Sequence, residues 1–141
     1  MEMIEIDQQL LADCHYLGRL PNCEVLLNRN ASLPWFILVP DTRLADVLDL
    51  PAEHRNAVLA ECAVVSEFIK VVLDFEKINF AGLGNLVPQM HMHIVGRYKG
   101  DPCWPRPVWG QLPEGGSYDE ARLREWQSGL AKMAGLEPAP L

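Results

Sequence analysis

One long helical pattern dominates this sequence, and the strand patterns lie in groups on either side of it instead of alternating with helices. The helix is predicted from Pro51 to about Phe75, since proline is tolerated in the first turn of a helix. Apolar residues recur along it at steps of four and three, at Val58, Cys62, Val65, Ile69 and Val72. Other apolar residues widen this stripe, which indicates either a helix well buried in one chain or a second partner, such as another copy of the chain.

Extended apolar segments predict four strands, at residues 23–27, 35–39, 77–81 and 90–97. The first two are separated by a short connection that begins with the turn residues Asn28 to Asn30, so they are expected to pair as a hairpin.

Two shorter helices are expected near the ends of the chain. The first spans residues 7–17 and ends at Gly18, and the second spans residues 117–134, where Ser117 and Glu120 have the spacing of a capping box. One long helix, terminal helices and consecutive strands together predict an α+β fold on an antiparallel sheet.

Length and composition predict a single soluble domain over residues 1–141, because 49% of the residues are hydrophobic and 22% are charged. No apolar run is long enough to cross a bilayer, and the acidic start at residues 1–5 lacks the basic segment of a signal peptide. The four cysteines form no closely spaced pair, which is typical of reduced thiols. A cytoplasmic protein is therefore expected.

The formal net charge of −7 argues against binding to a nucleic-acid polymer. Such binding depends on clusters of Lys and Arg that neutralise phosphates, and the sequence has no such cluster. A membrane role is not expected either. A small phosphate-bearing ligand remains compatible with this charge, because a few cations and backbone amides are enough to hold it.

The predicted strand around residues 89–95 carries the most informative pattern. Side chains alternate between the two faces of a strand, so Gln89, His91 and His93 are expected to share one face. The intervening residues are apolar and suit a core. This arrangement has three functional interpretations: a metal site, a nucleophile with a neighbour that fixes its tautomer, or a general acid and base. A solvent-facing strand with idle histidines is the fourth possibility.

The residues around this strand favour the nucleophile. A glycine-containing loop at residues 82–85 precedes it, and the backbone N–H groups of such a loop can bind an anion. The strand resembles the His-φ-His-φ-His-φ-φ signature of the histidine triad family, with Gln89 in the first triad position. Residues about 20 to 110 share the resemblance, in supporting segments at Leu27–Arg29, Trp35–Pro40, Pro51–Glu53, Asn79 and Trp104–Pro105.

The resemblance implies an antiparallel sheet of about five strands and a homodimer packed through the long helix. It also implies a hydrolase or transferase that acts on a small nucleotide without a metal or other cofactor. His91 is then the nucleophile that attacks the α-phosphate and forms a nucleotidyl-histidine intermediate, while His93 maintains the geometry through a hydrogen bond. Positions that match the family's nucleotide and phosphate contacts are Asn28, Asn79, Gly84 and Asn85.

Three departures from the family pattern affect the expected chemistry. Gln89 cannot carry a proton near neutral pH, Pro34–Trp35 replaces a Gly-His pair, and Leu86 stands where the family's phosphoramidases have a serine. Because proton-transfer capacity is lost, leaving groups that depart as stable anions are expected to be preferred over amines. The alternatives are a nucleotide-binding module without catalysis and a His-x-His metal site.

Overall fold

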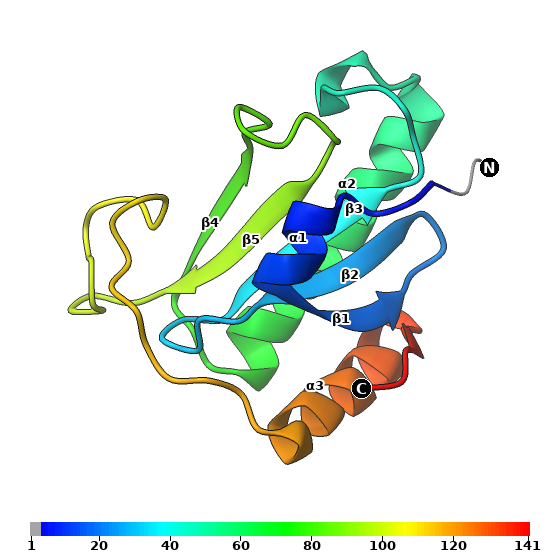
Figure 1. Ribbon diagram of the computed structural model, residues 1–141. Helices are drawn as coiled ribbons and strands as arrows, with labels where there is room; N and C mark the ends of the chain where they lie inside the picture. The colour runs from blue at the N-terminus through cyan, green and yellow to red at the C-terminus, as the bar shows by residue number, and fades with distance from the viewer. Residues whose placement is uncertain (1–3) are drawn as a thin grey trace.

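A computed structural model describes residues 4–141 and shows a six-stranded antiparallel sheet in the order β4-β5-β3-β2-β1-β6 (Figure 1). The first three residues of the acidic start lie outside the described residues. In chain order the elements are α1 (Gln8–Asp13), β1 (Cys14–Arg19), β2 (Cys23–Asn28), β3 (Trp35–Pro40), the 3-10 turn η1 (Val47–Asp49), α2 (Ala52–Glu67), the π turn η2 (Phe68–Val72), β4 (Lys77–Gly82), β5 (Met92–Arg97), α3 (Glu120–Ala134) and β6 (Glu137–Pro138).

The sheet has a different cover on each face. The main core lies between the sheet and helices α2 and α3, where Phe36 of β3 packs against Phe68 and Trp126. Helix α1 covers part of the opposite face, which we call the second face (Figure 1). A further apolar cluster on that face is formed with the irregular segment 101–113. The α+β fold expected from the sequence is confirmed.

Strand register positions the residues of the second face. The predicted hairpin forms between β2 and β3, with Leu26 opposite Ile37. Strand β5 pairs with β3 on one side and with β4 on the other, so that His93 lies opposite both Ile37 and Ala81. Opposed residues on neighbouring strands share a face, and this places the His93 side chain on the second face beside α1.

The helix predicted for residues 7–17 is wrong beyond Asp13. Only Gln8–Asp13 is helical, and Cys14–Arg19 forms β1, which pairs with β2 and β6. The apolar spacing fits a helix, but a strand satisfies the backbone groups of this segment through pairing on both sides. Gly18 has a φ of 147°, and a Cβ there would lie 2.2 Å from the carbonyl oxygen of Glu137, so β6 packs against the glycine backbone.

The long helix contains a change of winding that the sequence pattern did not reveal. Residues 52–67 are α-helical and Phe68–Val72 form a π turn, which adds one residue to the turn and shifts the phase of the stripe. Val58, Cys62 and Val65 are buried as predicted, whereas Val72 is 53% exposed. The predicted continuation of the buried stripe to Val72 is therefore wrong.

Three smaller corrections concern element ends and the number of strands. The fourth predicted strand begins at Met92 instead of Met90, so His91 lies immediately before β5. Asp119, rather than Ser117, caps α3, and its side chain accepts a hydrogen bond from the Arg122 N–H. The sheet has six strands where the resemblance implied about five, because β6 adds a short edge strand.

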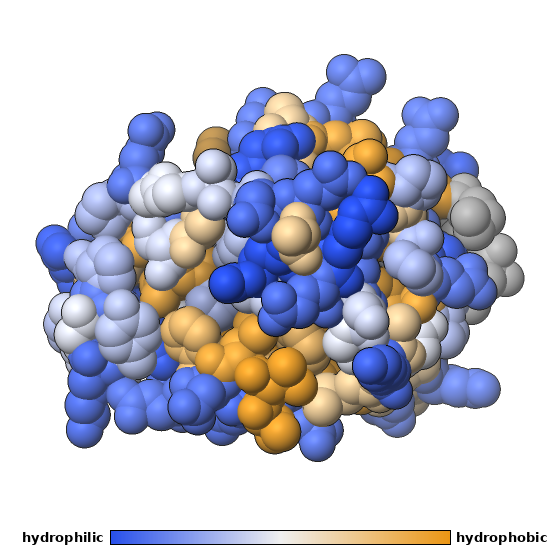
Figure 2. All heavy atoms as spheres, turned by 90° about the horizontal axis from the view of Figure 1, so that it is seen from below, coloured by the Kyte–Doolittle hydropathy of each residue, from blue (hydrophilic) through white to orange (hydrophobic). Residues whose placement is uncertain are grey.

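The face of the molecule seen from below is mostly hydrophilic, with an apolar patch near its lower edge (Figure 2). Apolar side chains exposed on η2 and β4 include Val71, Val72 and Phe80. No helix formed by residues 4–141 is long and apolar enough to cross a membrane. The four cysteines are free and buried.

Candidate active site

A cavity of about 920 Å³ opens on the second face, between α1, the loop that follows β4, and the segment 101–113. Both strand-borne histidines, His91 and His93, line it. The other lining residues are Asp7, Gln9, Leu10, Asp13, Asn28, Trp35, Ile37, Leu83, Gly84, Asn85, Leu86, Val87, Trp109 and Gly110. The cavity is large enough to hold a small organic ligand.

His91 has a defined tautomer. Its Nδ1 lies 2.7 Å from the carbonyl oxygen of Gln89, and the carbonyl can only accept a hydrogen bond, so Nδ1 carries the proton. In the neutral form of the ring, the lone pair is then on the other nitrogen, Nε2. The side chain is only 7% exposed, so the ring has little freedom to rotate. A neutral imidazole held in this way can act as a nucleophile.

His93 has the opposite tautomer. The indole Nε1–H of Trp35 donates to His93 Nδ1 over 3.0 Å, so the ring proton lies on Nε2. Burial, together with the charge on neighbouring His91, lowers the pKa of His93 to about 4. His93 is therefore a neutral hydrogen-bond donor at neutral pH, with its ring centroid 4.9 Å from that of His91. The hydrogen bond that holds His93 comes from the indole of Trp35.

Two tryptophans pack around His93. The Trp109 ring centroid lies 5.3 Å from that of His93, in an edge-on arrangement, and 6.0 Å from that of Trp35. The indole Nε1 of Trp109 is buried and has no hydrogen-bond partner among the described residues. A buried donor without a partner costs free energy. In the wall of a cavity, such a donor can be satisfied by a ligand oxygen.

The structure brings together most, but not all, of the predicted site residues. Asn28, Gly84 and Asn85 line the same cavity as the two histidines. Asn79 does not, because its Oδ1 accepts a hydrogen bond of 2.7 Å from buried Arg97. The expected nucleotide contact from Asn79 is therefore not supported.

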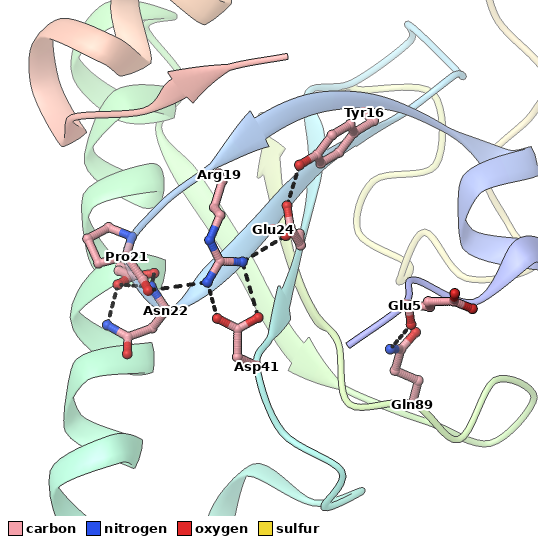
Figure 3. Close-up of polar contacts among 9 residues, drawn as sticks. Glu5, Tyr16, Arg19, Pro21, Asn22, Glu24, Asp41 and Gln89 are labelled. Carbon is pink, nitrogen blue, oxygen red and sulfur yellow. Dashed lines mark hydrogen bonds and ion pairs between the residues drawn. The ribbon is translucent and has the colours of Figure 1, made fainter. Parts of the chain in front are cut away.

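Gln89 also lies outside the cavity. Its amide is bonded to the chain that precedes α1, with Nε2 donating to the Glu5 carbonyl over 2.8 Å (Figure 3) and Oε1 accepting from the Asp7 N–H over 2.7 Å. The expectation that its side chain faces the same site as the histidines is wrong. The reason is that residues 89–91 precede β5, so the strict alternation of a strand does not apply to them.

The electrostatics of the cavity come from neutral donors and two carboxylates. Its described lining contains Asp7 and Asp13 but neither Lys nor Arg. A phosphoryl group would then depend on the His93 Nε2–H, the amides of the loop at 83–87 and the polar side chains for charge stabilisation. Among residues 4–141 no group of three or more His, Cys, Asp and Glu side chains is placed to hold a metal ion.

Comparison with known proteins establishes the family. A model of the HIT domain, which takes its name from the histidine triad, matches residues 9–100. The chain belongs to the histidine triad family. Members of this family are in general nucleotide-binding hydrolases and transferases.

Solved structures agree with this family over nearly the whole chain. The histidine triad protein of Marinobacter aquaeolei VT8 is 37% identical with a TM-score of 0.85, and the match covers 94% of this chain and 97% of that one. Those of Bradyrhizobium japonicum and Sinorhizobium meliloti 1021 are 34% and 32% identical, each with a TM-score of 0.84. The matches cover 92% of this chain and 97% and 96% of theirs. A comparison with curated proteins finds no match.

Several residues of this histidine triad cavity were not predicted from the sequence. Trp35 was expected only to replace an imidazole, yet its indole fixes the tautomer of His93. Asp7, Leu10 and Asp13 enter the lining through α1. Alternation along the hairpin indicates that Trp35 and Ile37 share a face, but the pairing of β3 with β5 determines that this face is the one with His93.

Proposed function

We propose that this histidine triad protein is a nucleotide-phosphate hydrolase or nucleotidyl transferase that works through a nucleotidyl intermediate on His91. The observation that carries the proposal is the hydrogen bond from His91 Nδ1 to the Gln89 carbonyl, which assigns the lone pair of the neutral ring to Nε2 at the cavity wall. Family membership supports the reaction class.

The reaction proceeds in two displacements. Nε2 of His91 forms a bond to the α-phosphorus while the bond from phosphorus to the leaving group breaks, and the leaving group takes that electron pair. The positive charge that develops on His91 is stabilised by the Nδ1–H bond to the Gln89 carbonyl. Water or a second acceptor then attacks phosphorus, loses a proton to solvent, and displaces His91 as a neutral imidazole. Covalent capture divides one difficult displacement into two easier ones.

Neutral donors in the cavity supply the stabilisation of the phosphoryl oxygens. His93 contributes its Nε2–H because Trp35 occupies Nδ1. The backbone amides of Gly84 and Asn85 belong to a loop that also lines the cavity, and they would bind the phosphate. Asn28 lines the same cavity and would contact the ribose.

The preferred leaving group departs as a stable anion. A leaving amine needs a proton from a general acid, but His93 remains neutral with a pKa of about 4, and the Gln89 side chain lies outside the cavity. A phosphate or phosphosugar leaves without that proton. Faster turnover of a nucleoside phosphoramidate than of a dinucleoside polyphosphate would contradict this preference.

The functional unit is a cytoplasmic homodimer that binds a small nucleotide, and neither a nucleic-acid polymer nor a membrane is a partner. An apolar hollow between α2 and β4, lined by Leu59, Cys62, Ala63, Ser66, Ile78, Phe80 and Ile94, supports self-association through the long helix. Such a hollow on a protein surface is a feature of interaction sites.

Intermediate trapping tests the proposed function. The protein, a His91→Ala variant and a His15→Ala control outside the cavity are incubated with a nucleoside phosphoramidate, a dinucleoside polyphosphate and a nucleoside diphosphate sugar. We expect the wild-type protein and His15→Ala to release nucleoside monophosphate and to show a nucleotidyl mass adduct, whereas His91→Ala should do neither. If none of the three proteins reacts and all bind AMP equally, the protein is a nucleotide-binding module instead.

A further inference from the structure

Gln89 occupies the first triad position, but its side chain bonds to the backbone before α1 instead of lining the cavity. Its amide forms two hydrogen bonds with backbone groups: it donates to the Glu5 carbonyl (Figure 3) and accepts from the Asp7 N–H. These bonds span more than 80 residues of sequence, from the approach to β5 back to the start of the described chain. They therefore attach the segment before α1 to the strand that carries the active site.

The segment held by Gln89 forms one wall of the active-site cavity. We call residues 5–13 the α1 wall; Asp7, Gln9, Leu10 and Asp13 of this wall line the cavity. Helix α1 has only six residues, which is too short to be stable without tertiary contacts. The polar contacts at its start include the two Gln89 bonds and the Asp7 side chain, which caps the helix by accepting from the Gln9 N–H. Ile6 adds an apolar contact, because it packs against the cluster of the second face.

The opposite end of the wall and its underside are held separately. The Asp13 carbonyl accepts a bond from the Arg29 N–H, and the Arg29 Nε donates to the Ala12 carbonyl. Leu10 is buried against Leu26 and Ile37 of the second face. Loss of the Gln89 bonds would then loosen the start of the wall, where the packing of Ile6 remains, while its end stays attached.

The same residue also holds the nucleophile, but through its backbone. The Gln89 carbonyl accepts from His91 Nδ1, and this bond does not depend on the Gln89 side chain. Backbone and side chain of one residue thus act on two different parts of the site: the carbonyl fixes the tautomer of His91, and the amide fixes the wall that faces it.

We propose that Gln89 is a positioning residue that holds the α1 wall closed against the nucleotide, so that its side chain governs substrate affinity and not the chemical step. This inference rests on the proposed function for its kinetic consequences. The carboxamide is suited to the role because it offers one donor and one acceptor side by side, as the Glu5 carbonyl and the Asp7 N–H require.

Three substitutions separate this role from the alternatives. Gln89→Ala removes both bonds, Gln89→Glu keeps the acceptor toward Asp7 but loses the donor toward Glu5, and Gln89→His restores the family residue. Gln8→Ala is the matched control, because Gln8 is an exposed glutamine at the start of α1. Hydrogen–deuterium exchange of peptides covering residues 4–13 should increase most in Gln89→Ala, less in Gln89→Glu and not in Gln8→Ala. Unchanged exchange in both Gln89→Ala and Gln89→Glu would overturn the proposal.

Binding and turnover give the second readout. The dissociation constant for AMP, measured by calorimetry, should rise by about 3- to 30-fold in Gln89→Ala, because only the closed fraction of the protein binds well. KM for the substrate found in the trapping experiment should rise by a similar factor, with a smaller effect on kcat. Gln89→His should behave like Gln89→Ala. A gain in kcat with this variant would instead place residue 89 in contact with the reacting groups and overturn the proposal.

These outcomes remain distinguishable from a failure of the proposed function. If the protein turns over no nucleotide, hydrogen–deuterium exchange at the α1 wall and the AMP dissociation constant still test whether Gln89 holds this wall. If it turns over nucleotide but Gln89→Ala lowers kcat and leaves KM unchanged, the proposed function is retained and the positioning role of Gln89 is rejected. Gln89→Glu, with its isosteric side chain, carries the test if Gln89→Ala fails to fold.

Discussion

In the proposed reaction, the Trp35 indole is the residue-scale feature with the most direct effect, because it determines which nitrogen of His93 carries the proton. Trp35→Phe keeps an aromatic ring beside Trp109 but removes the N–H donor. His93 then samples both tautomers, and its Nε2–H is available for only part of the time. We expect kcat/KM to fall by about 3- to 30-fold, the effect of one hydrogen bond that acts in the transition state.

The nitrogen-15 shifts of His93 report this change directly, since they distinguish an Nε2–H from an Nδ1–H ring. Trp104→Phe is the matched control, because Trp104 packs over the Arg97 guanidinium and does not line the cavity. A Trp35→Phe protein with the wild-type His93 tautomer and an unchanged kcat/KM would show that the indole bond is dispensable.

Burial of His93 also couples folding to pH. The pKa of His93 is about 4 in the folded protein and 6.5 for an exposed histidine, because burial disfavours the charged ring. As pH falls below 6.5, the unfolded chain binds a proton that the folded chain does not, so this part of the stability is complete above 6.5 and is lost toward pH 4. The loss should approach about 3 kcal/mol in the free energy of unfolding.

Urea unfolding at several pH values measures this dependence. His93→Gln removes the titrating group, so the fall in the free energy of unfolding between pH 6.5 and 4 should be smaller than in the wild type by most of that amount. Parallel pH profiles for the two proteins would contradict the assigned shift.

At the scale of elements, the segment 101–113 depends on an ion pair at the end of β5. Arg97 Nε donates to Asp101 over 2.7 Å, both side chains are almost fully buried, and the Cys103 N–H donates to the same carboxylate. This segment carries Trp109 to the cavity wall. Asp101→Ala leaves the Arg97 charge buried without its main partner, so we expect the free energy of unfolding to fall by about 3–5 kcal/mol.

The matched comparison is the pair of Arg124 with Glu120, which has the same spacing of four residues but is largely exposed. Arg124→Ala should change the free energy of unfolding by less than about 1 kcal/mol. Similar losses in the two variants would mean that the buried pair does not stabilise the segment.

Elements whose identity depends on local pattern were predictable, and those that depend on distant pairing were not. The β2–β3 hairpin and β4 follow from short apolar runs and turn residues, and their bounds agree with the structure to within a residue. Residues 14–17 have an apolar spacing that a helix also satisfies, so only their pairing with β2 and β6 makes them a strand. The π turn at residues 68–72 left no signal in the apolar spacing.

The same distinction explains how much of the site the sequence revealed. His91, His93, Asn28, Gly84 and Asn85 could be named in advance because they lie within motifs. The partner that fixes the tautomer of His93 could not, since the Trp35 bond spans 58 residues. The partner of His91 is only two residues away, but its bond depends on the irregular backbone before β5. Asn79 also belongs to the family pattern, but its side chain bonds to Arg97 instead of lining the cavity. A match to the family pattern shows where a residue stands in the sequence, and it does not show which cavity the side chain reaches.

At the scale of the whole molecule, the remaining question is what covers the apolar surface on α2 and β4. Phe80 is 47% exposed at the edge strand of the sheet and lines the hollow beside α2. A second copy of the chain would bury this side chain and the edge of β4 together. We therefore expect the 15.9 kDa chain to have twice that mass in solution, and Phe80→Glu to be monomeric because it would place a carboxylate in the apolar contact.

Size-exclusion chromatography with light scattering measures both masses, and Leu48→Glu provides the control. Leu48 is 77% exposed on η1, outside the α2–β4 hollow, so the same substitution there should leave the dimer intact. A wild-type protein that is monomeric at micromolar concentration would refute the homodimer. Dissociation by Leu48→Glu, but not by Phe80→Glu, would place the contact at η1 instead of the long helix.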